Sequence, residues 1–212
     1  MRTVVLSLIV VSTFAAEPAA LTIVLDYEQQ GFSESTQKSM EEETSSLLES
    51  AGLTVDWTDR AQAAKKPDMR DVFVFRMRGK CTMDSLPVIP DELGMPFALT
   101  RSTDGQVLSF GEVDCNRVRN ATKAALVDFS KADHLYGRAL GRVLAHEVYH
   151  MLAKSKAHAG RGVSRQCLSP RELTAEKLDF PGESLDAIRA QIGLLKTKRD
   201  SAKEVPSNAT LP

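Results

Sequence analysis

Two histidines and one glutamate lie close together in segment 146–150, which reads His-Glu-Val-Tyr-His. Histidines four positions apart share one face of an α-helix, so His146 and His150 could bind one zinc ion through their imidazole nitrogens. Glu147 follows the first histidine and could act as general base on a water molecule at the metal. The spacing therefore predicts a zinc site for hydrolytic chemistry at these three residues.

A catalytic zinc site usually has three protein ligands, and the nearest remaining imidazole is that of His158. An unbroken helix would carry His158 about 12 Å further along the axis, too far to share the ion. We therefore predict that the helix ends near 153–155 and that the chain turns back. Gly160 and Gly162 would permit such a turn.

Two glutamates of the next expected helix, Glu172 and Glu176, are the alternative third ligands. The fourth histidine, His134, precedes the motif by twelve residues and is expected at the protein surface. Tyr149 lies within the motif but points away from both histidines on an ideal helix, so it is expected to pack in the core.

Strand-like and helix-like segments alternate along the chain. Asp104-Gly105 between two short apolar runs predicts a β-hairpin. Gly137 and Gly141 suggest close packing of the motif helix on the sheet. The order predicts an α+β fold with a small mixed sheet, a backing helix, a long active-site helix and a short C-terminal helical part. The expected strands are 20–27, 53–57, 72–77, 97–100 and 106–110, and the expected helices are 34–50, 114–129, 131–153, a short one from Ser169, and 183–199.

The segment from Leu140 to Gly162 resembles the active-site helix of zincin metalloproteases, and the elements before it resemble the upper subdomain of metzincins. The chain departs from the metzincin pattern at three points. Ala153 replaces a glycine, Lys156 stands where metzincins have the third ligand, and no methionine follows Met151. The resemblance implies a zinc metalloprotease with a shallow cleft below an edge strand that binds substrate antiparallel, here near 106–110.

Three functional hypotheses follow. The first is an exported peptidase with Zn²⁺ held by His146, His150 and His158, with Glu147 as general base and a peptide or protein substrate. The second is an inactive binding or scaffold protein with the same fold, but such a protein would not need the glutamate. The third, a structural zinc site, usually requires cysteines, and none is near the motif.

The first residues of the chain are typical of a secretory signal. Arg2 precedes an apolar run from Val4 to Phe14, and the small residues Ala15 and Ala16 follow. The run is too short to span a bilayer comfortably. We therefore expect a cleavable signal peptide at 1–16, with an uncleaved anchor as the alternative, a secreted or periplasmic protein, and no membrane span in the mature chain.

The composition fits one globular domain. Of 212 residues, 42% are hydrophobic and 26% charged, and the formal net charge of −1 gives no reason to expect a nucleic-acid partner. We expect a single domain at 20–199, a disordered polar tail at 200–212, and a monomer.

The chain has three cysteines, Cys81, Cys115 and Cys167. In an oxidising compartment two of them can pair, and the sequence alone allows three pairings. We favour Cys81–Cys115, because both lie at the ends of expected strands in the same half of the domain.

Overall fold

The computed structural model describes residues 19–29, 31–66, 69, 71–84 and 95–203. The expected signal peptide and most of the proline-containing segment 84–96 lie outside these residues. So does the tail beyond residue 203, although the last helix continues into the first residues expected to be disordered.

In the described part of the chain, five strands form one mixed sheet in the order β2-β1-β3-β5-β4. The first four strands of that order run parallel, and β4 pairs antiparallel with β5. β4 and β5 are joined by Asp104 and Gly105, both with positive φ, as expected for a two-residue hairpin turn. The bounds are β1 Ala19–Tyr27, β2 Leu53–Asp59, β3 Val72–Arg78, β4 Ala98–Thr103 and β5 Gln106–Asp114.

The sheet has β2 and β4 at its edges and β5 inside, so the prediction of an edge near 106–110 was wrong. The reason lies in the pattern of burial. β5 buries Val107, Gly111 and Val113 on one face and pairs on both sides, whereas β4 has no fully buried residue and carries an exposed Arg101. A strand of that kind is typical of a sheet edge.

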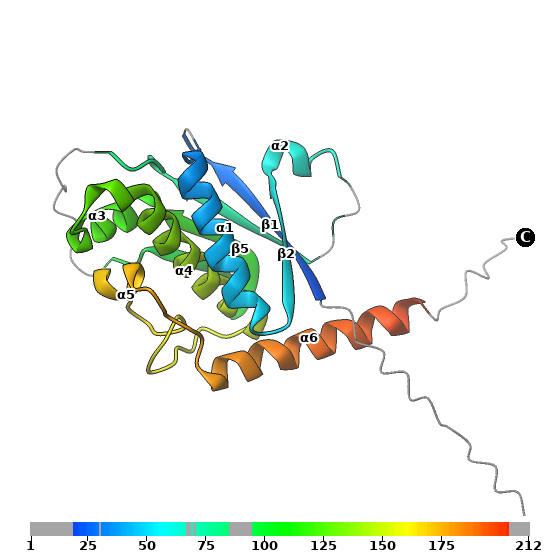
Figure 1. Ribbon diagram of the computed structural model, residues 1–212. Coiled ribbons are helices and arrows are strands. Elements are labelled where there is room, and N and C mark those ends of the chain that lie inside the picture. The colour runs from blue at the N-terminus through cyan, green and yellow to red at the C-terminus, as the bar shows by residue number, and fades with distance from the viewer. Residues whose placement is uncertain (1–18, 30, 67–68, 70, 85–94, 204–212) are drawn as a thin grey trace, which may run out of the picture.

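Most helices pack around α4, which lies beside the sheet with α1, α3 and α5 near it, while α6 runs below them (Figure 1). The short α2 was not expected, and α3 ends at Ala125, before a 3-10 turn at Phe129–Lys131. The bounds are α1 Glu34–Glu49, α2 Arg60–Ala63, α3 Cys115–Ala125, α4 Ala132–Ala153, α5 Pro170–Thr174 and α6 Gly182–Lys203. The predicted α+β class, with its mixed sheet, backing helix α1 and long α4, is confirmed.

The core forms where the sheet meets α1 and α4. β3 alternates in burial and turns Phe73, Phe75 and Met77 inward. The two glycines of α4 do pack closely, but against α1 and not against the sheet. A Cβ on Gly141 would lie 2.8 Å from the carbonyl oxygen of Met40, so the absence of a side chain lets the two helix backbones approach.

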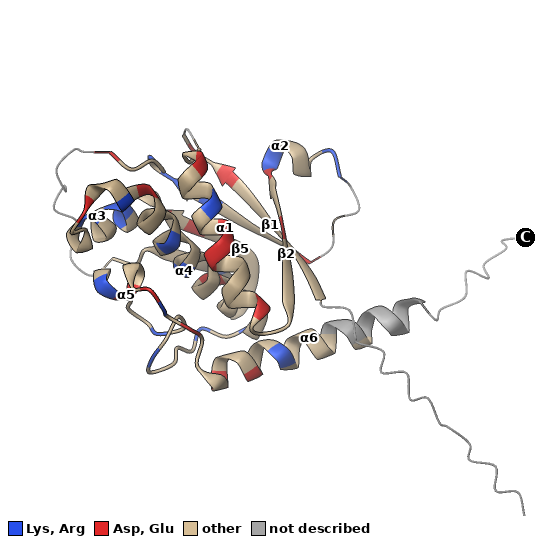
Figure 2. Cartoon of the chain, viewed as in Figure 1, with Lys and Arg blue, Asp and Glu red and all other residues tan. Residues whose placement is uncertain are grey.

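The predicted disulfide between Cys81 and Cys115 is confirmed, with their Cα atoms 4.9 Å apart. It links the segment after β3 to the first residue of α3, while Cys167 is free and exposed. Acidic and basic residues are interspersed over the helices that Figure 2 shows. No helix in the described residues is long and apolar enough to cross a membrane.

Candidate metal centre

α4 brings His146 and His150 together on one side, one helical turn apart. Their ring centroids are 4.7 Å apart, and the two Nε2 atoms are separated by 3.1 Å. The helix that carries them is buried along nearly all of its length, and His150 itself is only 6% exposed. The core packing of α4 therefore fixes the direction of both imidazoles.

The helix ends at Ala153, as predicted, and the chain reverses there. The reversal uses Lys154, which has φ 50° and donates its backbone N–H to the carbonyl of His150. The glycines expected to make this turn lie further on. Gly162, with φ 69°, makes a later bend against Asp179. A lysine in the left-handed region costs about 1 kcal/mol or more, so the surrounding structure must hold it.

The reversal brings His158 to the other two histidines. Its Nε2 lies 3.1 Å from Nε2 of His150, and one nitrogen from each of the three rings lies within 4.8 Å of the others. Glu172 is engaged elsewhere, because it accepts hydrogen bonds from Ser169 and Arg165. Glu176 is exposed and outside the histidine cluster. Of the candidate third ligands, the structure thus brings only His158 to the pair.

The second nitrogen of each α4 imidazole is bound to a backbone carbonyl. His146 Nδ1 lies 2.7 Å from the oxygen of Val163, and His150 Nδ1 lies 2.7 Å from that of Ser155. A carbonyl can only accept, so both Nδ1 atoms carry the proton and both Nε2 atoms present lone pairs. Two lone pairs 3.1 Å apart cannot hydrogen-bond to each other.

This donor set fits a zinc ion. Neutral imidazole is a common Zn²⁺ ligand, and two nitrogens at ~2.1 Å in a tetrahedral shell are roughly 3.4 Å apart. A cation between them would also remove the repulsion between the facing lone pairs. Burial lowers the pKa of His146, His150 and His158, which favours the neutral form that a metal requires.

Glu147 is 5% exposed, and its carboxylate meets the edge strand. The hydroxyl of Thr100 on β4 lies 2.5 Å from Oε2 of Glu147. Burial raises the pKa of the Glu147 carboxyl, and the hydrogen bond from Thr100 works against that rise. A carboxylate with a raised pKa is a stronger base at neutral pH than a solvated one.

The sequence did not indicate Thr100 or the two carbonyls, because strand pairing and a chain reversal bring them to the site. Tyr149 is buried, with its ring 6.2 Å from that of Phe180, as expected for core packing. His134 is exposed and contacts Ser39 of α1 at 2.8 Å, away from the cluster.

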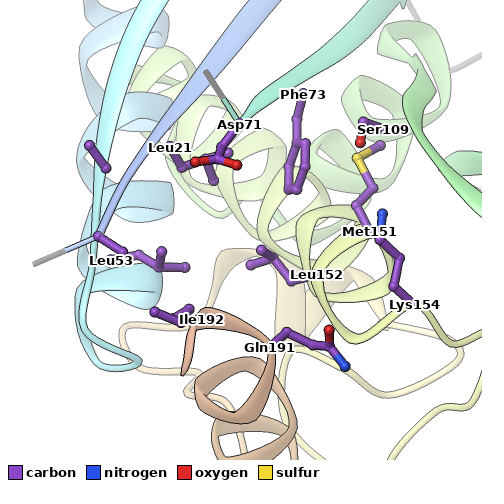
Figure 3. Close-up of a pocket in the computed structure, with 12 residues that line it drawn as sticks. Leu21, Leu53, Asp71, Phe73, Ser109, Met151, Leu152, Lys154, Gln191 and Ile192 are labelled. Atoms are coloured by element: carbon purple, nitrogen blue, oxygen red, sulfur yellow. The ribbon is translucent and has the colours of Figure 1, made fainter. Parts of the chain in front are cut away.

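A small cavity of about 140 Å³ lies between the sheet, the end of α4 and α6 (Figure 3). Its wall is mainly apolar, with Leu21, Phe73 and Leu152 among its members, and Asp71 and Lys154 also line it. Neither the three histidines nor Glu147 lines this cavity. It is therefore separate from the candidate metal centre.

Comparison with known proteins yields structural matches only. No protein-family model and no curated protein matches the sequence. An archaemetzincin from Methanopyrus kandleri is 13% identical, with 82% of this chain and 96% of that chain covered and a TM-score of 0.48. A zinc-dependent peptidase from Methanocorpusculum labreanum is 14% identical, with 78% and 99% covered and a TM-score of 0.52. The second match shows that this chain has the fold of that peptidase.

Proposed function

We propose that this chain is an exported zinc-dependent metallopeptidase that hydrolyses peptide bonds, with Glu147 as general base. One observation carries the proposal. Three imidazoles, on His146, His150 and His158, converge with nitrogens directed at a common point, and the residue next to the first of them is a buried glutamate. The zinc-dependent peptidase activity named for the structurally similar Methanocorpusculum protein supports it.

Each group of the centre has a definite part in this reaction. The three histidines would hold the metal, and the carbonyls that accept from Nδ1 fix the ring orientation of His146 and His150. A zinc ion bound there supplies an acidified water and polarises the scissile carbonyl. Glu147 takes a proton from the attacking water and passes it to the nitrogen of the leaving amine.

The edge strand supplies a place for the substrate. β4 pairs only with β5 in the described sheet, and Thr100 brings it into contact with Glu147. An extended peptide can add to such an edge through main-chain hydrogen bonds, which place a peptide bond near the metal. The substrate class is therefore a peptide or an unfolded protein segment, and we propose that the enzyme is a monomer. Export follows from the predicted signal peptide.

Metal analysis of the purified mature protein, combined with a peptide-library cleavage assay, tests the function. Wild type should contain about one zinc per chain and cleave peptides. Glu147→Gln should keep the zinc and lose about 10²–10⁴-fold in rate, because it removes the base and leaves the ligands. Zinc without any cleavage would support the inactive scaffold, and a Glu147→Gln variant as fast as wild type would disprove the role of the glutamate.

A further inference from the structure

Thr100 joins the edge strand directly to the candidate base. Its hydroxyl oxygen lies 2.5 Å from Oε2 of Glu147 and 3.4 Å from the backbone carbonyl oxygen of the same residue. A hydroxyl has one proton to donate, and the much shorter contact is the hydrogen bond. The carboxylate is therefore held through one of its two oxygens.

The backbone of β4 determines where this hydroxyl points. The pairing of β4 with β5 shifts in register between Thr100 and Ser102. Irregularities of this kind change the direction of side chains and are frequent beside active sites. Arg101, inside the irregularity, binds Glu112 through two N–H groups at 3.2 and 2.6 Å. The strand is thus anchored immediately after Thr100.

The residue opposite Thr100 on β5 brings the sheet close to α4. Gly111 pairs with Thr100, and a Cβ on Gly111 would lie 3.0 Å from the Met151 side chain. The backbone of β5 at Gly111 thus lies close to Met151 of α4, the helix that carries Glu147. A side chain as short as threonine can therefore span the distance.

We propose that Thr100 is a positioning residue that holds Oε2 of Glu147 so that Oε1 faces the attacking water. The proposal rests on the peptidase function proposed above. The last torsion of a glutamate is broad, so a carboxylate held at neither oxygen would populate several orientations. A hydrogen bond at Oε2 selects one of them. A general base must lie within hydrogen-bond reach of its proton, and an error of about 1 Å can cost about 10²-fold in rate.

Kinetics of two substitutions test this role. Thr100→Val keeps the shape and removes the donor, so kcat should fall about 10²-fold while KM stays within about twofold of wild type. Thr100→Ser keeps a hydroxyl and should retain most of the rate. Thr54→Val, at an exposed position of β2 on the opposite edge of the sheet, is the matched control and should behave as wild type. An unchanged kcat in Thr100→Val, or a loss confined to KM, would overturn the proposal.

A spectroscopic measurement separates this proposal from the proposed function. Infrared difference spectra between wild type and Glu147→Gln isolate the Glu147 carboxyl band. Thr100→Val should shift this band and Thr100→Ser should leave it in place. If wild type cleaves no peptide, the peptidase function fails, but the band still reports whether Thr100 holds Glu147. An unshifted band means that it does not. Thr100→Ala replaces Thr100→Val if circular dichroism shows that the valine variant is unfolded.

Discussion

In the first half of α4, the buried Arg142 binds partners inside the protein through Nε and Nη1, with only Nη2 unpaired among the described residues, whereas in the second half imidazole nitrogens face one another. Arg142 is fully buried, and its guanidinium lies 2.7 Å from the carboxylate of Glu43 on α1. The hydroxyl of Thr44 on α1 donates to the carbonyl of Met40 in its own helix at 2.8 Å and lies 3.2 Å from the carbonyl oxygen of Gly141. One turn later, His146 and His150 present unprotonated Nε2 atoms to each other at 3.1 Å.

This difference separates stability from function within one helix. A buried polar group without a partner costs roughly 1–3 kcal/mol, so folded proteins rarely keep one without a reason. In the first half Arg142 binds Glu43 of α1 and donates to the backbone carbonyl of Glu172 on α5, so the pairing fastens three helices together. In the second half the facing Nε2 atoms fit the proposed zinc ion and not another side chain. Substitutions in the first half should change stability, and those in the second half should change metal binding.

The largest effect is expected from His150→Ala, which removes the central imidazole of the cluster. Zinc content should fall from about one ion per chain to near zero, because the two remaining histidines bind zinc too weakly to retain it. His134→Ala, at the exposed histidine, should retain the metal. Chelation by EDTA should lower the melting temperature of wild type but not of His150→Ala, since only the former is stabilised by bound metal. Stoichiometric zinc in His150→Ala would place the metal elsewhere.

The second effect concerns stability alone. Glu43→Ala leaves the buried guanidinium of Arg142 without its counter-charge, and should lower the free energy of unfolding by about 3 kcal/mol. Zinc content should not change. Glu42→Ala is the control, because its pair with Lys38 is solvent-exposed and should be worth less than about 1 kcal/mol. Urea denaturation of wild type and the two variants measures these free energies. Equal stability of Glu43→Ala and Glu42→Ala would contradict the prediction.

The histidine–glutamate part of the site and most elements could be predicted from the sequence, because local spacing determines them. Residues i and i+4 share a helix face in any fold, so His146 and His150 were expected to be neighbours. The end of the helix before Lys156 was also predicted. Its cause was not, because a lysine in the left-handed region depends on contacts made by the loop that follows.

Features that depend on distant pairing were missed or misplaced. The edge strand was placed at β5, because which strand of a hairpin lies at the edge depends on which of them pairs with a third strand. The contact of Thr100 with Glu147 spans 47 positions and depends on that order of strands. The spacing of Gly137 and Gly141 indicated close packing, but the sequence could not identify α1 as the element packed against them.

A third effect tests that helix contact. Gly141→Ala places a Cβ 2.8 Å from the backbone oxygen of Met40 and should destabilise the protein by about 1–3 kcal/mol. Gly193→Ala in α6 is the matched control. Among the described residues, no atom outside the helix's own backbone lies within 4 Å of the added Cβ there, and helix propensity should make the change neutral or stabilising by up to about 1 kcal/mol. Thermal unfolding gives both values, and a stabilised Gly141→Ala would contradict the close packing.

The smallest effect is expected at Glu172, which belongs to neither half of α4 but supports the loop that carries His158. Hydrogen bonds from Ser169, together with Arg165, hold the pKa of this carboxyl below its usual value. A group whose folded-state pKa is lowered stabilises the fold above its unfolded pKa of about 4.3, and the contribution is lost as the pH falls through the lower folded-state value. Glu172→Gln keeps a side-chain acceptor for the helix cap and removes the charge.

Unfolding curves of wild type and Glu172→Gln, measured from pH 7 downwards, should therefore differ by about 0.5 kcal/mol at neutral pH and converge below about pH 4. Glu176→Gln, at an exposed position between α5 and α6, should leave the free energy of unfolding unchanged at every pH. Both variants should keep stoichiometric zinc, because neither carboxylate belongs to the histidine cluster. Loss of zinc in Glu172→Gln would instead make Glu172 a ligand and would remove the distinction between the pairing that stabilises the fold and the cluster that binds the metal.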